Sequence, residues 1–216
     1  MHESVQKLVH IEKLVKSKET DSKKITIVAV SKTFKLDKIL PLINYGHLHY
    51  GENKVQEALD KWSLMKEKKP KIKLHLVGKL QTNKVKFALK IFDYIHSVDS
   101  EKLAKKIADE EIKQNKKVKI FLQVNIGNED QKSGIAKKNL SSLLSYCKNL
   151  GLDVIGLMCL PPANIDPILF FKELNKMSQS LSLPELSMGM SSDYGEAIEN
   201  SSTFIRVGSS IFGERS

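Results

Sequence analysis

The sequence predicts a single-domain (β/α)8 TIM barrel with an extra N-terminal helix. Short apolar segments alternate with helical segments along the sequence, and eight strand candidates are found, the number that closes such a barrel. The length of 216 residues, 41% of them hydrophobic, suffices for one domain with a substantial core. A doubly wound open sheet is the alternative, but no GxGxxG turn follows the first strand candidate. We therefore expect residues 1–216 to form one domain.

The elements are assigned in order along the sequence. An amphipathic helix near the N-terminus is predicted by apolar residues at helical spacing, namely Val5, Leu8, Ile11, Leu14 and Val15. The apolar runs that predict strands are 25–31, 47–50, 72–77, 94–97, 118–125, 152–159, 185–189 and 203–207. The intervening segments that predict helices are 36–44, 53–68, 82–91, 100–114, 137–149, 166–182 and 193–200.

The formal net charge of +10 raises the hypothesis of a nucleic-acid or ribosome-associated protein. Of the 35 basic residues, however, all but Arg206 and Arg215 are lysines, and aromatic residues do not alternate with them as stacking platforms would. We therefore interpret the lysines as surface solvation and expect no nucleic-acid partner.

Composition also bears on location and on metal binding. No apolar run approaches the roughly 18 residues of a membrane span, and the N-terminus lacks the layout of a secretory signal. Cys147 and Cys159 fall in apolar patterns typical of reduced core residues, and no CxxC or HxxxH pair indicates a metal site. We expect a cytoplasmic protein without a metal. We also expect a monomer, because no large exposed apolar patch is evident.

Lys32 directly follows the first strand candidate. In a barrel the active site gathers at the carboxyl ends of the strands, so this amine is expected at the mouth of a packed core. There its pKa can fall below the usual value of about 10.4, which makes the amine a nucleophile toward carbonyl compounds. The alternative is that Lys32 only marks the strand end and extends into water. Position alone leaves both interpretations open.

Small and hydroxyl residues follow the last two strand candidates, in Gly189–Asp193 and Arg206–Ser210. Barrels bind phosphate at this place, where backbone N–H groups, serine hydroxyls and a helix N-terminus converge. The alternative is that these turns merely cap helices, with Ser191 or Ser192 as the N-cap.

A nucleophilic lysine and a phosphate site together predict a pocket for a phosphorylated aldehyde. Pyridoxal 5′-phosphate (PLP), held by a Schiff base to Lys32, is the obvious candidate. Arg206 would then point from the eighth strand toward the pyridine nitrogen. Because a guanidinium is permanently protonated, it would donate a hydrogen bond and keep that nitrogen unprotonated. The alternative is that Arg206 is a structural ion-pair partner.

Several motifs follow one another in the order in which they occur in a known protein family, and they cover nearly all of residues 25–213. They are Val28–Lys32, Tyr50–Glu57, His75–Lys84, Gln123–Asn125, Lys132–Gly134, Gly156–Met158, Ser187–Asp193 and Ile205–Gly213. In these motifs the sequence resembles the pyridoxal phosphate homeostasis proteins, relatives of the N-terminal barrel of alanine racemases.

The resemblance implies a cofactor site. Lys32 would carry PLP as an internal aldimine, with Arg206 beside the pyridine nitrogen and Ser191, Gly208 and Ser209 around the phosphate. Asn53 and Met158 would line the pocket, whereas the Gly51-Glu52-Asn53 and Gln81-Asn83-Lys84 motifs would serve its rim or a surface. Proteins of this family are thought to buffer and deliver PLP without an established catalytic turnover, and PLP-dependent apoenzymes are the partners this suggests.

Two enzymatic functions are alternatives to cofactor binding and delivery. Racemisation needs an acid/base group on each face of the substrate carbon, and Lys32 serves one face. Alanine racemases take the opposing tyrosine from a separate β-domain, and this sequence ends three residues after its last motif. We therefore expect PLP binding without efficient racemisation, with a racemase-like enzyme of low activity as the alternative. A Schiff-base aldolase is the other hypothesis, and Glu52 is its one plausible acid/base carboxylate.

Overall fold

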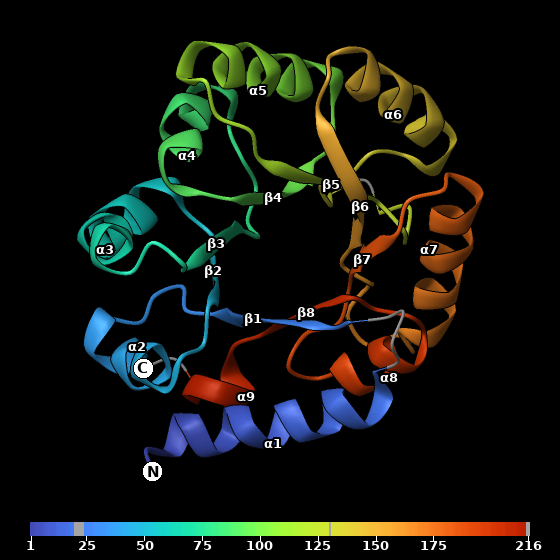
Figure 1. Ribbon diagram of the computed structural model, residues 1–216. Coiled ribbons are helices and arrows are strands. Elements are labelled where there is room, and N and C mark those ends of the chain that lie inside the picture. Colours follow the sequence, from blue (N-terminus) through green and yellow to red (C-terminus); the bar gives the residue numbers. More distant parts are fainter. Residues whose placement is uncertain (20–23, 130, 215–216) are drawn as a thin grey trace.

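The computed structural model describes residues 1–19, 24–129 and 131–214. Eight parallel strands close into a barrel in sequence order, and the last strand pairs with the first (Figure 1). The strands are β1 (Thr26–Val30), β2 (His49–Glu52), β3 (Lys73–Leu76), β4 (Tyr94–Val98), β5 (Lys119–Val124), β6 (Asp153–Cys159), β7 (Glu185–Ser187) and β8 (Phe204–Val207). Closure confirms the predicted barrel and excludes the open sheet.

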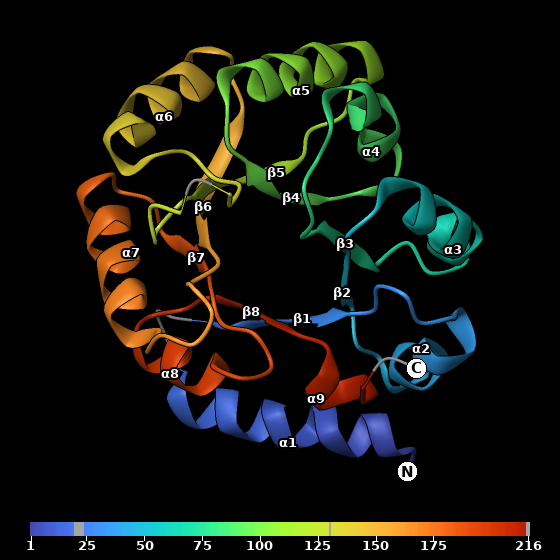
Figure 2. The same ribbon diagram turned by 180° about the vertical axis from the view of Figure 1, so that it is seen from behind.

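Helices surround the barrel, and Figure 2 shows the same ring from behind. They are α1 (Glu3–Lys18), α2 (Leu36–Tyr45), α3 (Val55–Lys68), α4 (Val85–Ile91), α5 (Glu101–Gln114), α6 (Leu140–Asn149), α7 (Ile168–Ser180), α8 (Tyr194–Glu199) and α9 (Ser209–Phe212). The predicted N-terminal helix is confirmed as α1, which packs against α2, α8 and α9. No helix in the described part of the chain is both long and apolar enough to cross a bilayer.

Local sequence explains most element boundaries. The run from Ile27 to Val30 is buried throughout, as expected for a parallel strand covered on both faces. Helix α5 ends where Asn115 adopts a left-handed conformation. Strand β7 ends at Ser187, earlier than predicted, and Gly189 follows with a positive φ of 91°.

Other boundaries also differ from the sequence prediction, for example those of β2, α4 and α6. Strand β2 begins at His49, opposite Lys73, because pairing with β3 starts there. Helices α4 and α6 are each preceded by a short 3₁₀ turn, Thr82–Lys84 and Lys137–Asn139, instead of being helical from their predicted starts.

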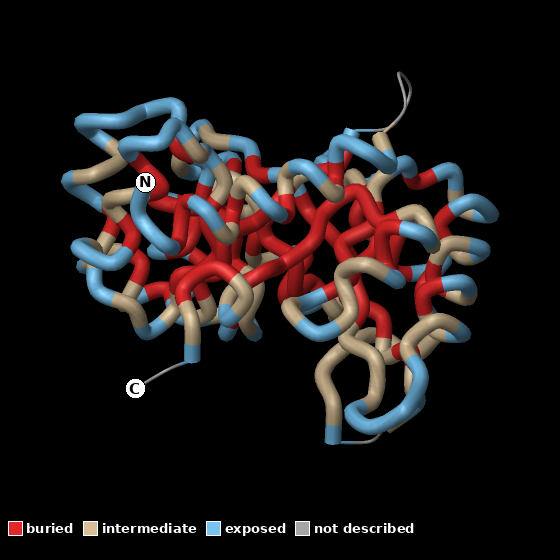
Figure 3. Tube along the Cα trace, turned by 90° about the horizontal axis from the view of Figure 1, so that it is seen from below, coloured by how far each residue is buried: buried red, intermediate tan, exposed pale blue. Residues whose placement is uncertain are grey.

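Buried residues occupy the centre of the molecule and exposed ones the outer surfaces of the helices (Figure 3). The larger core cluster includes buried residues from both the strands and the surrounding helices. A smaller cluster consists of the strand residues Val28, Phe121, Met158 and Phe204. Polar residues are buried in the strands as well, among them His75, His96, Ser187 and Arg206.

Candidate functional site

A cavity of about 850 Å³ opens at the carboxyl ends of the strands. Its described lining comes from the ends of β1, β2, β3, β5, β6, β7 and β8, from the loops that follow them, and from Gly213 and Glu214 after α9. It brings together most of the residues predicted from the sequence, namely Lys32, Asn53, Ser191, Arg206, Gly208 and Ser209. The predicted site residues after four different strands therefore share one cavity.

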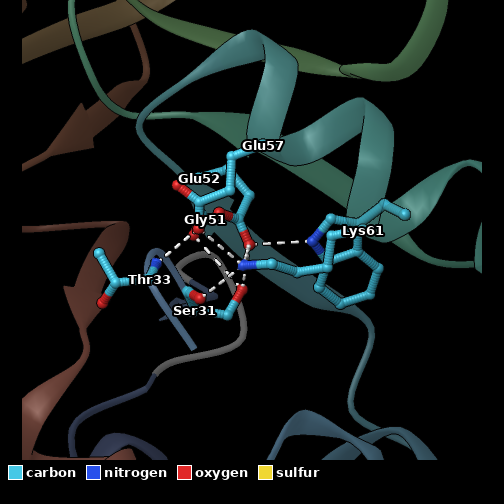
Figure 4. A network of polar contacts seen from close by, with 7 residues as sticks. Ser31, Thr33, Gly51, Glu52, Glu57 and Lys61 are labelled. Atoms are coloured by element: carbon cyan, nitrogen blue, oxygen red, sulfur yellow. Dashed lines mark hydrogen bonds and ion pairs between the residues drawn. The ribbon is translucent and has the colours of Figure 1, made fainter. Parts of the chain in front are cut away.

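The backbone on both sides of Lys32 is anchored to helix α3 (Figure 4). Before it, the Ser31 carbonyl accepts a hydrogen bond from Lys61 Nζ at 2.9 Å. After it, the Thr33 N–H donates to Glu57 Oε1 at 2.6 Å, and Thr33 has a φ of 69°. A β-branched residue is rarely found in that left-handed region, so the surrounding contacts hold the loop in this conformation.

Glu52 lies at the centre of the same network (Figure 4), and it is not among the described residues that line the cavity. Its Oε1 accepts hydrogen bonds from Ser31 Oγ at 2.7 Å, Lys61 Nζ at 3.0 Å and Trp62 Nε1 at 2.9 Å. Burial raises the pKa of Glu52, and the positive charge of Lys61 opposes that shift. Glu52, the carboxylate named by the aldolase hypothesis, is therefore not among the described residues that line the cavity.

The Glu57 carboxylate completes this network. Burial acts to raise its pKa, but hydrogen bonds from Lys61 and the Thr33 N–H outweigh burial, so the pKa of Glu57 is lowered. Lys61 is thus held between two carboxylates and the Ser31 carbonyl, at 3.0 Å, 3.0 Å and 2.9 Å. We call Ser31, Glu52, Glu57 and Lys61 the Glu52 network.

Asn53 and Gly78 line the cavity where the loops after β2 and β3 touch. A Cβ atom on Gly78 would lie 2.4 Å from the Asn53 carbonyl oxygen, so this close approach requires glycine. The second predicted motif lies elsewhere: Gln81, Asn83 and Lys84 are exposed and are not part of the cavity lining.

The loops after β7 and β8 are joined through Ser191. Its Oγ accepts hydrogen bonds from the backbone N–H groups of Gly208 at 3.1 Å and Ser210 at 3.3 Å. The Ser210 hydroxyl donates in return to the Ser191 carbonyl at 3.2 Å. Serine hydroxyls and backbone N–H groups, the kinds of donor that bind phosphate, thus meet at one side of the cavity, where the N–H groups of Gly208 and Ser210 donate to Ser191 Oγ.

Arg206 extends from β8 and is 5% exposed. Its Nη1 donates to Ser187 Oγ at 2.7 Å and its Nη2 to the Cys159 carbonyl at 3.0 Å. Burial lowers the pKa of Arg206, yet an arginine remains protonated at neutral pH. Burial also raises the pKa of Cys159 to about 12, so its side chain stays a neutral thiol.

Met158 differs from the other predicted site residues in its position. It is fully buried with Val28, Phe121 and Phe204, and it is not among the residues that line the cavity. Met158 pairs with Ser187, the last residue of β7. It therefore lies level with the end of that strand and not with Ser191 in the loop that follows. A contact between Met158 and a cofactor remains a prediction.

Charged side chains give the cavity an excess of positive charge. Its described lining includes Lys32, Lys79, Lys132 and Arg206 against the single carboxylate of Glu214. Such an excess favours an anionic ligand. Lys79, Lys132 and Gln123 were not predicted to line the site, although all three lie in motifs noted in the sequence.

Within residues 1–19, 24–129 and 131–214, no group of three or more His, Cys, Asp and Glu side chains is placed to hold a metal ion.

Comparison with known proteins establishes the family. The chain matches the family described as the alanine racemase N-terminal domain over residues 8–216. Proteins named pyridoxal phosphate homeostasis protein from Aquifex aeolicus and Vibrio cholerae are 37% and 36% identical to it, over 88% of this chain and 86% of each relative. The structure of PipY from Synechococcus elongatus, with PLP bound, shares 32% identity and a TM-score of 0.85 and covers 97% of this chain and 100% of its own. This chain therefore belongs to the alanine racemase N-terminal domain family and, within it, to the pyridoxal phosphate homeostasis proteins.

Proposed function

We propose that this protein binds PLP through the amine of Lys32 and serves PLP homeostasis by buffering the cofactor and delivering it. One observation carries the proposal: Lys32, Arg206 and the Ser191 cluster line a single cavity in a chain of this family. When bound, PLP supplies an aldehyde that condenses with an amine.

The cavity residues fit this cofactor by their chemistry. Lys32 provides the amine, and Arg206 provides a buried donor for the pyridine nitrogen. Ser191, Gly208 and Ser209 line the side of the cavity that we assign to the phosphate, and the positive charge of the lining favours it. We propose Asn53 and Met158 as further contacts to the ring.

We further propose that the protein does not turn over amino acids efficiently. None of the described residues that line the cavity is a tyrosine, so a second acid/base group of the kind used in racemisation is not seen there. The test is to incubate the PLP-loaded protein with L-alanine and other amino acids and assay for the D-enantiomers. Turnover of about 1 s⁻¹ or faster, an ordinary enzyme rate, would contradict the proposal.

The remaining parts of the proposal concern the cellular setting. We propose that residues 1–216 act as one domain and as a monomer in the cytoplasm, and that PLP-dependent apoenzymes receive the cofactor. The free cysteines Cys147 and Cys159 support a reducing compartment. Sedimentation of the PLP-loaded protein tests the monomer, and reactivation of a PLP-free transaminase tests delivery.

The binding proposal is tested with two lysines of the same cavity. We expect the protein loaded with PLP to absorb near 420 nm, roughly the wavelength of PLP bound to an amine. Lys32→Ala should lose this absorbance, whereas Lys79→Ala should keep it, because Lys79 lines the cavity without being the proposed attachment site. Equal absorbance in the two variants would overturn the assignment of Lys32.

A further inference from the structure

A continuous series of polar side chains crosses the barrel interior from the cavity to the opposite end. Arg206 Nη1 lies 2.7 Å from Ser187 Oγ, which lies 2.8 Å from His96 Nδ1. His96 Nε2 is 3.0 Å from His75 Nδ1, and His75 Nε2 is 2.9 Å from His49 Nδ1. We call these five residues the interior network. They come from β8, β7, β4, β3 and β2.

The two ends of the interior network lie at different openings of the protein. Arg206 lines the main cavity at the carboxyl ends of the strands. His49 is the first residue of β2 and lines a second, smaller pocket together with residues of α1, including Glu12 and Lys16. The network therefore spans the barrel along its axis.

The two central histidines are fully buried and stacked on aromatic rings. His75 lies 4.1 Å from the Tyr94 ring and His96 lies 4.4 Å from the Phe121 ring, both measured between centroids. Burial lowers the pKa of both histidines well below the usual value, and nearby positive charge adds to the effect. Both rings are therefore neutral at pH 7, with one nitrogen as donor and the other as acceptor.

Arg206 sets the direction of these hydrogen bonds. A guanidinium carries only donors, so Ser187 Oγ accepts from Arg206 Nη1. Among the described residues, His96 Nδ1 is the other hydrogen-bond partner of Ser187 Oγ, so the hydroxyl proton is donated to that nitrogen. The His96 proton is then on Nε2. The opposite direction would leave the Ser187 proton without an acceptor in a buried site, which is unfavourable.

The position of the His96 proton fixes the protons of the next two rings. His96 Nε2–H donates to His75 Nδ1, and His75 Nε2–H donates to His49 Nδ1. The side-chain donors and acceptors of Ser187, His96 and His75 are all satisfied in this arrangement, and each of the two buried rings has one defined tautomer.

We propose that Ser187, His96, His75 and His49 are positioning residues that act through Arg206. The three histidines hold Ser187 Oγ as a fixed acceptor. Ser187 Oγ and the Cys159 carbonyl then fix the two terminal nitrogens of the Arg206 guanidinium. Two of its five N–H donors are used in this way, which leaves the others for a ligand in the cavity. The inference rests on the proposed function, because Arg206 is the proposed donor to the pyridine nitrogen of PLP.

The first experiment measures the tautomers directly. The full-length protein is labelled with ¹⁵N-histidine, and two-bond ¹H–¹⁵N correlation spectra are recorded at pH 7 with and without PLP. Single His75→Gln and His96→Gln variants assign the signals. We expect both rings to be neutral with the proton on Nε2. A cationic ring, or a proton on Nδ1 of His75 or His96, would overturn the inference whether or not PLP binds.

The second experiment separates positioning from simple structural support. Ser187 and Ser202 are both fully buried, and Ser202 Oγ donates to the Met188 carbonyl at 2.7 Å without touching Arg206. Both alanine variants lose more than one buried hydrogen bond. We expect Ser187→Ala to weaken PLP binding about tenfold, since an acceptor of a charged donor is lost, and to give mixed His96 tautomers. Ser202→Ala should leave both properties unchanged.

The outcomes distinguish the inference from the proposed function. Equal PLP affinity of Ser187→Ala and Ser202→Ala, with wild-type protein that loads PLP normally, contradicts the positioning role. Wild-type protein that does not bind PLP at all contradicts the proposed function, and the tautomer spectra then still decide whether the interior network has the inferred direction.

Discussion

Lys32 occupies a loop whose backbone is fixed from both sides before any ligand arrives. Lys61 is the residue on which this depends, because its ammonium contacts the Ser31 carbonyl and the carboxylates of Glu52 and Glu57. Holding a reactive group in place before binding reduces the entropy lost when it reacts. We therefore interpret the Glu52 network as support for the reactive amine.

Replacement of Lys61 tests this interpretation. Lys61→Met removes a buried cation and leaves Glu52 without its charged partner, so we expect the free energy of unfolding to fall by about 3 kcal/mol. Lys66→Met is a matched control on the same helix, since Lys66 binds the Ile91 carbonyl at 2.9 Å and Asp93 at 2.6 Å. Urea denaturation should show a loss of stability for both variants.

Binding should separate the two variants. Only Lys61→Met loosens the loop around Lys32, so the rate at which PLP absorbance near 420 nm develops should fall severalfold in that variant alone. Stopped-flow mixing with PLP measures this rate. Equal rates for Lys61→Met and Lys66→Met would show that the network stabilises the fold without preparing the amine.

Gly78 allows a second prediction for a single residue. Gly78→Ala places a Cβ atom 2.4 Å from the Asn53 carbonyl, so the loops after β2 and β3 must separate. We expect a loss of about 2 kcal/mol in the free energy of unfolding, in the range of overpacked sites. Gly195→Ala meets nothing within 4 Å and should change stability by less than about 0.5 kcal/mol. A stable Gly78→Ala protein would refute the tight contact.

At the scale of elements, the loops after β7 and β8 act as one unit because Ser191 Oγ joins them. We predict that Ser191→Ala weakens PLP binding about tenfold, since a hydroxyl near the phosphate is lost. Binding of pyridoxal, which lacks the phosphate, should be nearly unchanged. Titration of both ligands by absorbance compares the two. An equal loss for pyridoxal would mean that Ser191 acts on the fold and not on the phosphate.

Most elements could be predicted from sequence because their signals are local. Buried parallel strands such as Thr26–Val30 are continuous apolar runs, and helices such as Glu101–Gln114 repeat apolar residues at helical spacing. The convergence of Lys32, Ser191 and Arg206 also followed, since a barrel collects the residues that end its strands.

The interior network was missed, for a physical reason. His75 and His96 are single polar residues in otherwise apolar strands, and local sequence does not show which residues they meet across the barrel. Their contacts depend on the stagger between strands, which places His96 of β4 against Ser187 of β7. The available signal was the occurrence of four of the six histidines, His47, His49, His75 and His96, at or near consecutive strands.

Glu52 was placed at the right strand end but with the wrong environment for the aldolase hypothesis. Sequence position suggested a carboxylate near Lys32, and the structure directs it toward Ser31, Lys61 and Trp62. The indole and the ammonium reach it from helix α3, a contact between elements that strand-end reasoning does not capture.

For the molecule as a whole, the buried histidines predict how stability depends on pH. Folding lowers the pKa values of His75 and His96, whereas a histidine in the unfolded chain has a pKa of about 6.5. Below that pH the unfolded chain therefore binds more protons than the folded protein. Stability is therefore fully present above pH 6.5 and falls as the pH drops. Between pH 7.5 and 5.5 the two groups together should cost about 3 kcal/mol.

Urea denaturation at the two pH values measures this loss. His10→Gln replaces an exposed histidine and should leave the pH dependence unchanged. A loss below about 1 kcal/mol in the wild-type protein would mean that His75 and His96 are not held neutral in the folded state.

The central claim is that Lys32 holds PLP at the mouth of the barrel, and borohydride reduction tests it most directly. The PLP-loaded protein is reduced, digested and mapped by mass spectrometry. We predict that the modified lysine is Lys32, and that Lys32→Ala carries no modification while Lys79→Ala is labelled at Lys32 as before. Modification of another lysine in the wild-type protein, or undiminished labelling of Lys32→Ala, would contradict the account.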